Sequence, residues 1–230
     1  MDHAADWPNV CVGRCTASAL GFGCAPYDRL DHFIAMTTLI YLHGFLSSPL
    51  SQKAQETTAW MAEQGLAAHY LCPTIPMEPT AASAMLTDLL APLHGDFCLV
   101  GSSLGGFFAT WAVEQFGGRA VLINPAVRPY TLINQYLGEQ ENYQTGEIHF
   151  IDASFADKLC QLEARPSDLS RYWLLAQTGD EVLDYRDAVD WYAGCQQTIL
   201  PGGDHGFIGY SEWLAPIWAF ATATHLKSSE

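Results

Sequence analysis

The chain has 230 residues, of which 49% are hydrophobic and 15% charged, and its formal net charge is −15 at pH 7. This length predicts a single domain with a large core, and the low charged fraction excludes a disordered protein. The acidic excess argues against nucleic acid and anionic membrane surfaces as partners, because both require a basic surface.

Seven cysteines at irregular spacings form neither a disulfide framework nor a Cys-x-x-Cys metal pair, and the histidines show no metal-ligand spacing. No stretch reaches the ~20 apolar residues of a membrane span. The N-terminus also lacks the basic segment and long apolar run of a secretory signal. These features together predict a cytoplasmic protein without a metal site.

Residues 1–35 mix Gly, Cys, Ala and Asp with scattered aromatic residues and show no clear period. We expect an N-terminal extension of uncertain order here, followed by the folded domain over 36–230. Because Met36 directly precedes the first strong strand pattern, three explanations stay open. They are a start site assigned too early, a flexible extension and an N-terminal subdomain.

Strand and helix patterns alternate through the rest of the chain. Strands are predicted over 38–42, 67–71, 97–100, 120–123, 172–176 and 197–200. Helices are predicted over 51–64, 80–93, 104–115, 184–193 and 210–225. This alternation predicts an α/β fold, in which a mainly parallel sheet of about six strands carries helices on both faces.

One segment, 126–171, interrupts the alternation and is longer than an ordinary connection. It carries polar and aromatic residues with weak helical signals. We interpret it as a small lid or cap insertion over the strand ends. A surface insertion without a role is the alternative.

A Gly101-x-Ser103-x-Gly105 motif lies between the third strand and the helix that follows it. This context is typical of a nucleophile elbow, in which the serine occupies a strained turn and the glycines allow strand and helix to approach closely. The alternative is a Gly- and Ser-rich loop without chemical consequence. Phosphate-binding interpretations fail, because neither the Lys-Ser/Thr of a P-loop nor G-x-G-x-x-G is present.

Further polar residues follow other strands, and the carboxyl ends of parallel strands meet at one edge of the sheet. Asp180 follows the fifth strand and His205 the sixth. With Ser103 they appear in the chain order Ser, Asp, His that α/β-hydrolases use. The backbone N–H groups of Phe45 and Leu104 are predicted to hold an oxyanion, because the first strand would lie beside the third.

Some of these assignments have rivals. Asp180 competes with three other acids of the same loop and helix, namely Glu181, Asp184 and Asp187. His205 could merely cap a loop, and the neighbouring Asp204 is interpreted as an acid that orients the turn. His43 and Gly44, after the first strand, are interpreted as residues that shape the oxyanion loop rather than as a second base.

Five segments resemble the YqiA-like esterases, a family of compact bacterial α/β-hydrolases. They are TLIYLHGFLSSP over 38–49, VGSSLGG over 100–106, INPAVRP over 123–129, QTGDEVLDY over 177–185 and GGDHGF over 202–207. The resemblance covers 36–230 but not 1–35. It implies hydrolysis of esters or thioesters by Ser103, His205 and Asp180, without a metal or cofactor.

The sequence therefore predicts a serine esterase that forms an acyl-serine intermediate on a small-molecule ester or thioester. One alternative is a non-catalytic binding protein with the same fold. Another is an acyltransferase or carbon–carbon bond hydrolase that uses the same three residues. Acyl and alcohol specificity and oligomeric state are not encoded in these motifs.

Overall fold

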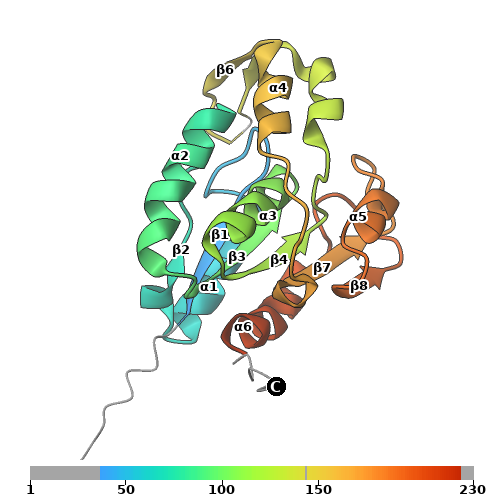
Figure 1. The fold of residues 1–230 in the computed structure, drawn as a ribbon. Helices are drawn as coiled ribbons and strands as arrows, with labels where there is room; N and C mark the ends of the chain where they lie inside the picture. Colours follow the sequence, from blue (N-terminus) through green and yellow to red (C-terminus); the bar gives the residue numbers. More distant parts are fainter. Residues whose placement is uncertain (1–36, 143, 224–230) are drawn as a thin grey trace, which may run out of the picture. The chain divides into compact units, whose positions relative to one another are not determined.

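A six-stranded sheet with the order β2-β1-β3-β4-β7-β8 forms the centre of the fold, and all its strand pairs are parallel. The computed structural model describes residues 37–142 and 144–223, so the extension predicted over 1–35 lies outside the described residues. Figure 1 shows how the strands follow one another across the sheet. Their bounds are β1 (Thr38–Leu42), β2 (Tyr70–Leu71), β3 (Phe97–Ser102), β4 (Arg119–Ile123), β7 (Tyr172–Gln177) and β8 (Gln196–Leu200).

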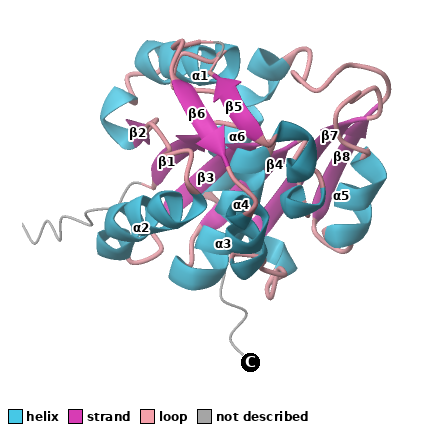
Figure 2. Ribbon diagram, turned by 90° about the horizontal axis from the view of Figure 1, so that it is seen from above, coloured by secondary structure: helices cyan, strands magenta, loops and turns pink. Residues whose placement is uncertain are grey.

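Helices cover both faces of this sheet, as the sequence predicts. Two hydrophobic clusters divide the strand side chains between the faces because successive residues of a strand point to opposite sides. In β3, for example, Leu99 belongs to one cluster, whereas Cys98 and Val100 belong to the other. One face packs against α2 (Pro79–Leu90), α3 (Leu104–Phe116) and α5 (Tyr185–Trp191), and the other against α1 (Gln52–Glu63) and α6 (Leu214–Thr222) (Figure 2).

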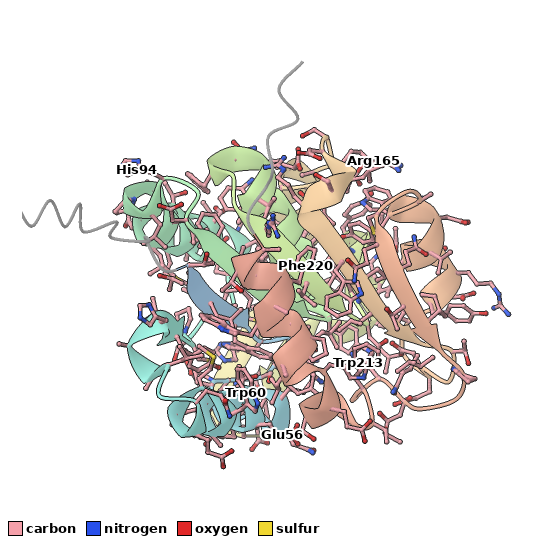
Figure 3. All side chains as sticks on the ribbon, turned by 90° about the horizontal axis from the view of Figure 1, so that it is seen from below. Glu56, Trp60, His94, Arg165, Trp213 and Phe220 are labelled. Carbon is pink, nitrogen blue, oxygen red and sulfur yellow. The ribbon has the colours of Figure 1, made fainter. Side chains whose placement is uncertain are left out.

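Large aromatic side chains pack on the face that α1 and α6 cover. Three of them are partly buried against this cluster, namely Trp60 of α1, Trp213 directly before α6 and Phe220 of α6 (Figure 3). The ring of Trp173 in β7 lies 5.9 Å from that of Trp213 and 5.7 Å from that of Phe220. These contacts hold the last helix on the sheet and so fix the loop that precedes it.

Several predicted elements are shorter in the structure than in the sequence analysis, and two of them have a clear local cause. Of the strand predicted over 67–71, only Tyr70 and Leu71 pair with β1, because Ala67–His69 still turns as a 3-10 helix after α1. The helix predicted over 80–93 ends at Leu90 and continues as a 3-10 turn. Pro92 explains this end, since it has no N–H for a helical hydrogen bond.

The segment 126–171 contains structure that the sequence analysis did not predict. An antiparallel hairpin forms from β5 (Gly138–Glu141) and β6 (Ile148–Ile151), and α4 (Ser154–Gln161) follows it. Two 3-10 turns, Pro129–Thr131 and Ile133–Tyr136, precede the hairpin. In Figure 1 the hairpin and α4 lie beyond one end of the sheet.

The predicted last helix begins as a 3-10 turn, Tyr210–Trp213, and α6 then runs to Thr222. Its predicted end at 225 lies outside the described residues. Across the described ranges, none of the helices has the length and apolar character needed to cross a membrane.

Candidate active site

Ser103 occupies the turn between β3 and α3 with φ 55° and ψ −121°. A residue other than glycine rarely adopts a positive φ, and such strain costs about 1–3 kcal/mol. The turn is held on both sides, because Ser103 N donates to Ile123 O (3.0 Å) and Ser103 O accepts from Gly106 N (2.9 Å). This is the backbone geometry that the sequence predicts for a nucleophile elbow.

Gly101 and Gly105 allow the close approach that this turn requires. A Cβ at position 101 would lie 2.4 Å from the carbonyl oxygen of Gly105. One at position 105 would lie 2.1 Å from the carbonyl oxygen of Leu42, at the end of β1. Both distances are far below van der Waals contact with backbone atoms, so only glycine fits at either position.

The loop after β1 lies directly against the serine. A Cβ on Gly44 would be 3.2 Å from Ser103 Cβ and 3.7 Å from its Oγ. Phe45 and Leu104 both line the same cavity as Ser103. The Leu104 N–H is the first of α3 and so has no partner within its helix, and no bond from it to another described residue is found. The two residues predicted to hold an oxyanion therefore border the same cavity as the serine.

His43 is buried, and both of its ring nitrogens are used within the fold. Its Nε2 accepts a hydrogen bond from Ile75 N (3.0 Å), so its Nδ1 donates to Gly44 O (3.1 Å). Burial lowers the pKa of this imidazole below its usual value, with a smaller opposing effect from the Gly44 carbonyl. These bonds attach the loop after β1 to the segment around Ile75, and the role of His43 in shaping the oxyanion loop stays a prediction.

Asp180 and His205 form a carboxylate–imidazole pair at the ends of β7 and β8. The Nδ1 of His205 lies 2.9 and 3.0 Å from the two carboxylate oxygens, and the Asp180 side chain is only 2% exposed. Asp180 Oδ1 also accepts from the backbone N–H groups of Val182 and Leu183, each at 2.9 Å. A carboxylate on Nδ1 places the proton there and leaves a lone pair on Nε2.

The rival acids have other contacts. Glu181 Oε2 accepts from the backbone N of His205 (3.0 Å), so it holds the same residue without touching its ring. Asp184 is the N-cap of α5, and Asp187 lies in the first turn of that helix. Asp204 binds its neighbours through its backbone, whereas its buried Oδ1 has no hydrogen-bond partner in the described part of the chain.

A cavity of about 500 Å³ is lined by both Ser103 and His205. Its volume is typical of a small-molecule site. Within 37–142 and 144–223, no direct hydrogen bond joins the two side chains. The walls are mainly apolar, and most of their apolar residues come from the loop after β1 and from the insertion, including Phe45, Leu46, Leu132, Ile133, Tyr136 and Leu159.

The insertion is attached to the loop after β1 by several contacts. The ring of Phe45 packs edge-on against Tyr136 of the insertion, at 5.2 Å between centroids. Ser48 Oγ donates to Gln144 Oε1 (2.8 Å), and Asn142 Nδ2 donates to Ser47 O (3.0 Å). The residues predicted to form a lid thus line the cavity that holds Ser103.

Lys53 is a site residue that the sequence analysis missed. It lies in the first turn of α1, lines the cavity and donates from Nζ to the carbonyl of Gly206 (2.8 Å), next to His205. The pKa of Lys53 is lowered overall. Burial is the main cause, and it exceeds the opposing effect of the nearby carboxylates of Asp204, Glu56 and Asp180. Because 153 residues separate the two partners, no local sequence signal could reveal this contact.

The described residues contain no group of three or more His, Cys, Asp or Glu side chains arranged to hold a metal ion.

Solved structures with a similar fold include α/β-hydrolases, and the chain has the α/β-hydrolase fold. Est1E from Butyrivibrio proteoclasticus superposes with a TM-score of 0.59 at 14% identity, covering 80% of this chain and 86% of Est1E. For the mouse alpha/beta hydrolase domain-containing protein 10 the TM-score is 0.58 at 18% identity, covering 78% of this chain and 87% of the mouse chain. For an esterase domain from a Rhodothermus marinus protein the TM-score is 0.50 at 16% identity, covering 80% of this chain and 86% of that domain.

The model of the uncharacterised protein family UPF0227 matches residues 38–222, and the chain belongs to this family. It is the YqiA family, so the resemblance inferred from the five segments is confirmed. The match begins at the first residue of β1, and residues 1–37 lie outside it.

Proposed function

We propose that this protein is a serine hydrolase that cleaves carboxylic esters or thioesters of small acyl substrates. The observation that carries the proposal is the bond of His205 Nδ1 to the buried Asp180 carboxylate, because His205 lines the same cavity as the strained Ser103. A serine hydroxyl is a weak nucleophile at neutral pH and needs an adjacent base. An imidazole oriented by a carboxylate supplies that base.

In the proposed reaction, Ser103 Oγ forms a bond to the substrate's carbonyl carbon while His205 Nε2 takes the hydroxyl proton. The N–H groups of Phe45 and Leu104 stabilise the resulting oxyanion. When the bond to the leaving group breaks, the imidazolium returns its proton to the departing alcohol or thiol. Water then attacks the acyl-serine with His205 as base again, which releases the acid and restores the hydroxyl.

The character of the cavity supports an acyl substrate. Its volume of about 500 Å³ suits a small molecule, and its mainly apolar walls favour an aliphatic or aromatic acyl group over a charged one. Among the structural neighbours, Est1E has been solved with ferulic acid bound, and that structure is 13% identical to this chain. A substrate panel should therefore include aromatic as well as straight-chain acyl esters.

The direct test compares wild type with Ser103→Ala on a chromogenic short-chain ester. We expect turnover to disappear in the variant, and a fluorophosphonate probe to label wild type but not Ser103→Ala. Ser83→Ala, at a partly exposed position of α2 outside the cavity lining, is the control and should keep both signals. Full activity of Ser103→Ala would remove the proposal.

The same experiments separate the alternatives. A non-catalytic binding protein predicts no labelling of Ser103 by the probe. Parallel assays of esters, thioesters and diketones distinguish an esterase from a thioesterase or a carbon–carbon bond hydrolase, and added alcohol acceptors reveal acyl transfer. The proposal includes the cytoplasmic location inferred from the sequence, which cell fractionation tests.

A further inference from the structure

Two buried amide side chains bind the loop of His205 to the ends of the neighbouring strands β4 and β7. Asn124 follows β4 and is 3% exposed, and Gln177 ends β7 and is 4% exposed. Both belong to segments that the sequence analysis singled out without giving them a role. A buried amide must be hydrogen-bonded to be tolerated, so its partners show what it holds in place.

The turn after β4 is bound to the backbone of Ser103. Ser103 N donates to Ile123 O, and Ala126 N donates to Ser103 O, both at 3.0 Å. Pro125 lies so close to Gly106 that a Cβ at this glycine would be only 2.6 Å from Pro125 Cβ. The residue between these contacts, Asn124, therefore has a fixed position relative to the nucleophile.

The side chain of Asn124 extends from this turn to the histidine loop. Its Nδ2 donates to the carbonyl oxygens of Asp204 (2.9 Å) and His205 (3.2 Å). Its Oδ1 accepts from Gln177 N (2.9 Å), so the amide also binds the strand that leads to Asp180. The side chain of Asn124 thus joins the turn that holds Ser103 to the histidine loop and to the strand that leads to Asp180.

Gln177 holds the same loop from the next strand. Its Oε1 accepts from Asp204 N (3.1 Å) and Ile208 N (2.9 Å), and its Nε2 donates to Ile208 O (2.7 Å). Gly203 makes room for this amide, since a Cβ there would lie 2.0 Å from Oε1. Hydrogen bonds to Gln177 therefore fix the backbone on both sides of His205.

The conformation of Asn124 supports a specific role for its amide. Its φ is 40°, a left-handed value that asparagine adopts more readily than most other residues except glycine. A glycine would satisfy this backbone without strain but would provide no amide. The turn therefore permits a variant that removes the side chain and keeps the chain path.

We infer that Asn124 and Gln177 are positioning residues that set the place of the His205 imidazole relative to Ser103. The inference rests on the proposed function. In the described ranges, no hydrogen bond joins the serine and histidine side chains, so their separation depends on the loops that carry them. A displacement of a reacting group by about 1 Å can cost on the order of 100-fold in rate.

The test measures kcat, KM and the rate of fluorophosphonate labelling for Asn124→Gly, Asn124→Asp, Gln177→Met and Gln177→Glu. Asn124→Asp keeps the acceptor for Gln177 N but loses the donor to the histidine loop. Gln177→Glu keeps the acceptor for Asp204 N and Ile208 N, which Gln177→Met loses. Gln197→Met is the matched control, because Gln197 donates to Val189 O and Tyr192 O away from the cavity.

We expect kcat and the labelling rate to fall about 10- to 100-fold in Asn124→Gly, Asn124→Asp and Gln177→Met, with KM changed less than about threefold. Gln177→Glu should retain more of kcat than Gln177→Met. The kcat and labelling rate of Gln197→Met should stay within about twofold of wild type, even if this variant loses as much thermal stability as Gln177→Met.

Two results would overturn the inference while leaving the proposed function intact. One is wild-type kcat in Asn124→Gly and Gln177→Met when Ser103→Ala is inactive. The other is a loss in Gln197→Met as large as in Gln177→Met, which would show a general effect of stability. If Asn124→Gly fails to fold, the two Gln177 variants decide the question. Full activity of Ser103→Ala would remove the proposed function and this inference with it.

Discussion

The aromatic ring of Phe45 packs against that of Tyr136, with centroids 5.2 Å apart and ring planes at 61°. The first residue comes from the loop whose N–H is proposed to bind the oxyanion, and the second from the insertion between β4 and β7. Phe155 of α4 also lies against Phe45, at 6.3 Å. A change in the insertion therefore acts on the wall of the cavity and on the loop beside Ser103.

Narrowing the cavity from the insertion should change acyl-chain preference. Leu132 lines the cavity and is 38% exposed, so Leu132→Trp adds bulk without overfilling a closed core. We expect kcat/KM for an octanoyl ester to fall about tenfold or more relative to a butyryl ester, because each excluded methylene is worth about 1–3 kcal/mol. Kinetics on a series of nitrophenyl esters would measure this ratio.

Leu137→Trp is the matched control for this prediction. Leu137 lies in the same insertion and is 46% exposed, but it does not line the cavity. Its chain-length profile should match that of wild type. An unchanged profile in Leu132→Trp would show that the acyl group binds elsewhere.

The strain at Ser103 should separate activity from stability. Ser103→Ala and Ser103→Gly both remove the nucleophile, and both should be inactive. Glycine adopts a φ of 55° freely, whereas alanine keeps the strain of about 1–3 kcal/mol. Glycine also loses more conformational freedom on folding than alanine, which costs about 0.5–1 kcal/mol. When this cost is subtracted from the relieved strain, the free energy of unfolding of Ser103→Gly should exceed that of Ser103→Ala by about 1 kcal/mol. Urea unfolding of the two variants measures this difference, and equal midpoints would argue against strain at the turn.

The parts of the fold that the sequence predicts well are those with local signals. The buried run of β3 and the glycines around Ser103 reveal strand, turn and helix together, because each requirement acts within a few residues. The order of Ser103, Asp180 and His205 along the chain, each after a predicted strand, was enough to expect their loops at one edge. The contact between Asp180 and His205 agrees with that expectation.

Other features depend on contacts between distant segments, and the sequence analysis missed them. The β5–β6 hairpin places Ile148 and Phe150 at the surface, 57% and 73% exposed, so these strands lack the buried run of β3. The bond from Lys53 to Gly206 and the bonds of Asn124 to the histidine loop form only when separate loops meet. The sequence could mark Asn124 as a residue after a strand but could not identify its partners.

Neutral variants of the two neighbouring acids should distinguish their roles. Asp180→Asn replaces a carboxylate oxygen that faces His205 Nδ1 and so favours the wrong tautomer, and we expect kcat to fall on the order of 10⁴-fold. Glu181→Gln keeps an oxygen that can accept from His205 N, and it should stay within a few-fold of wild type. Steady-state kinetics on one ester would compare them, and a larger loss in Glu181→Gln would reverse the assignment.

Burial of His43 should make stability depend on pH. Its pKa is lowered in the folded protein, chiefly by burial, so below about pH 6.5 the unfolded chain binds a proton that the native state does not. The stability of the fold should therefore decrease as the pH falls from about 6.5 toward the folded-state pKa, and this contribution is absent above 6.5. Its slope can reach about 1.4 kcal/mol per pH unit.

The variant His43→Gln isolates this effect from the other histidines. Its amide can accept from Ile75 N and donate to Gly44 O but does not titrate. Urea unfolding at pH 5.5, 6.5 and 7.5 should show a smaller loss of stability on acidification in His43→Gln than in wild type. Because the His43 imidazole is neutral above pH 6.5, the free energies of unfolding of the two proteins should differ by a constant amount there. Below pH 6.5 the two free energies should converge. Parallel curves over the whole range would mean that His43 takes up its proton equally in both states.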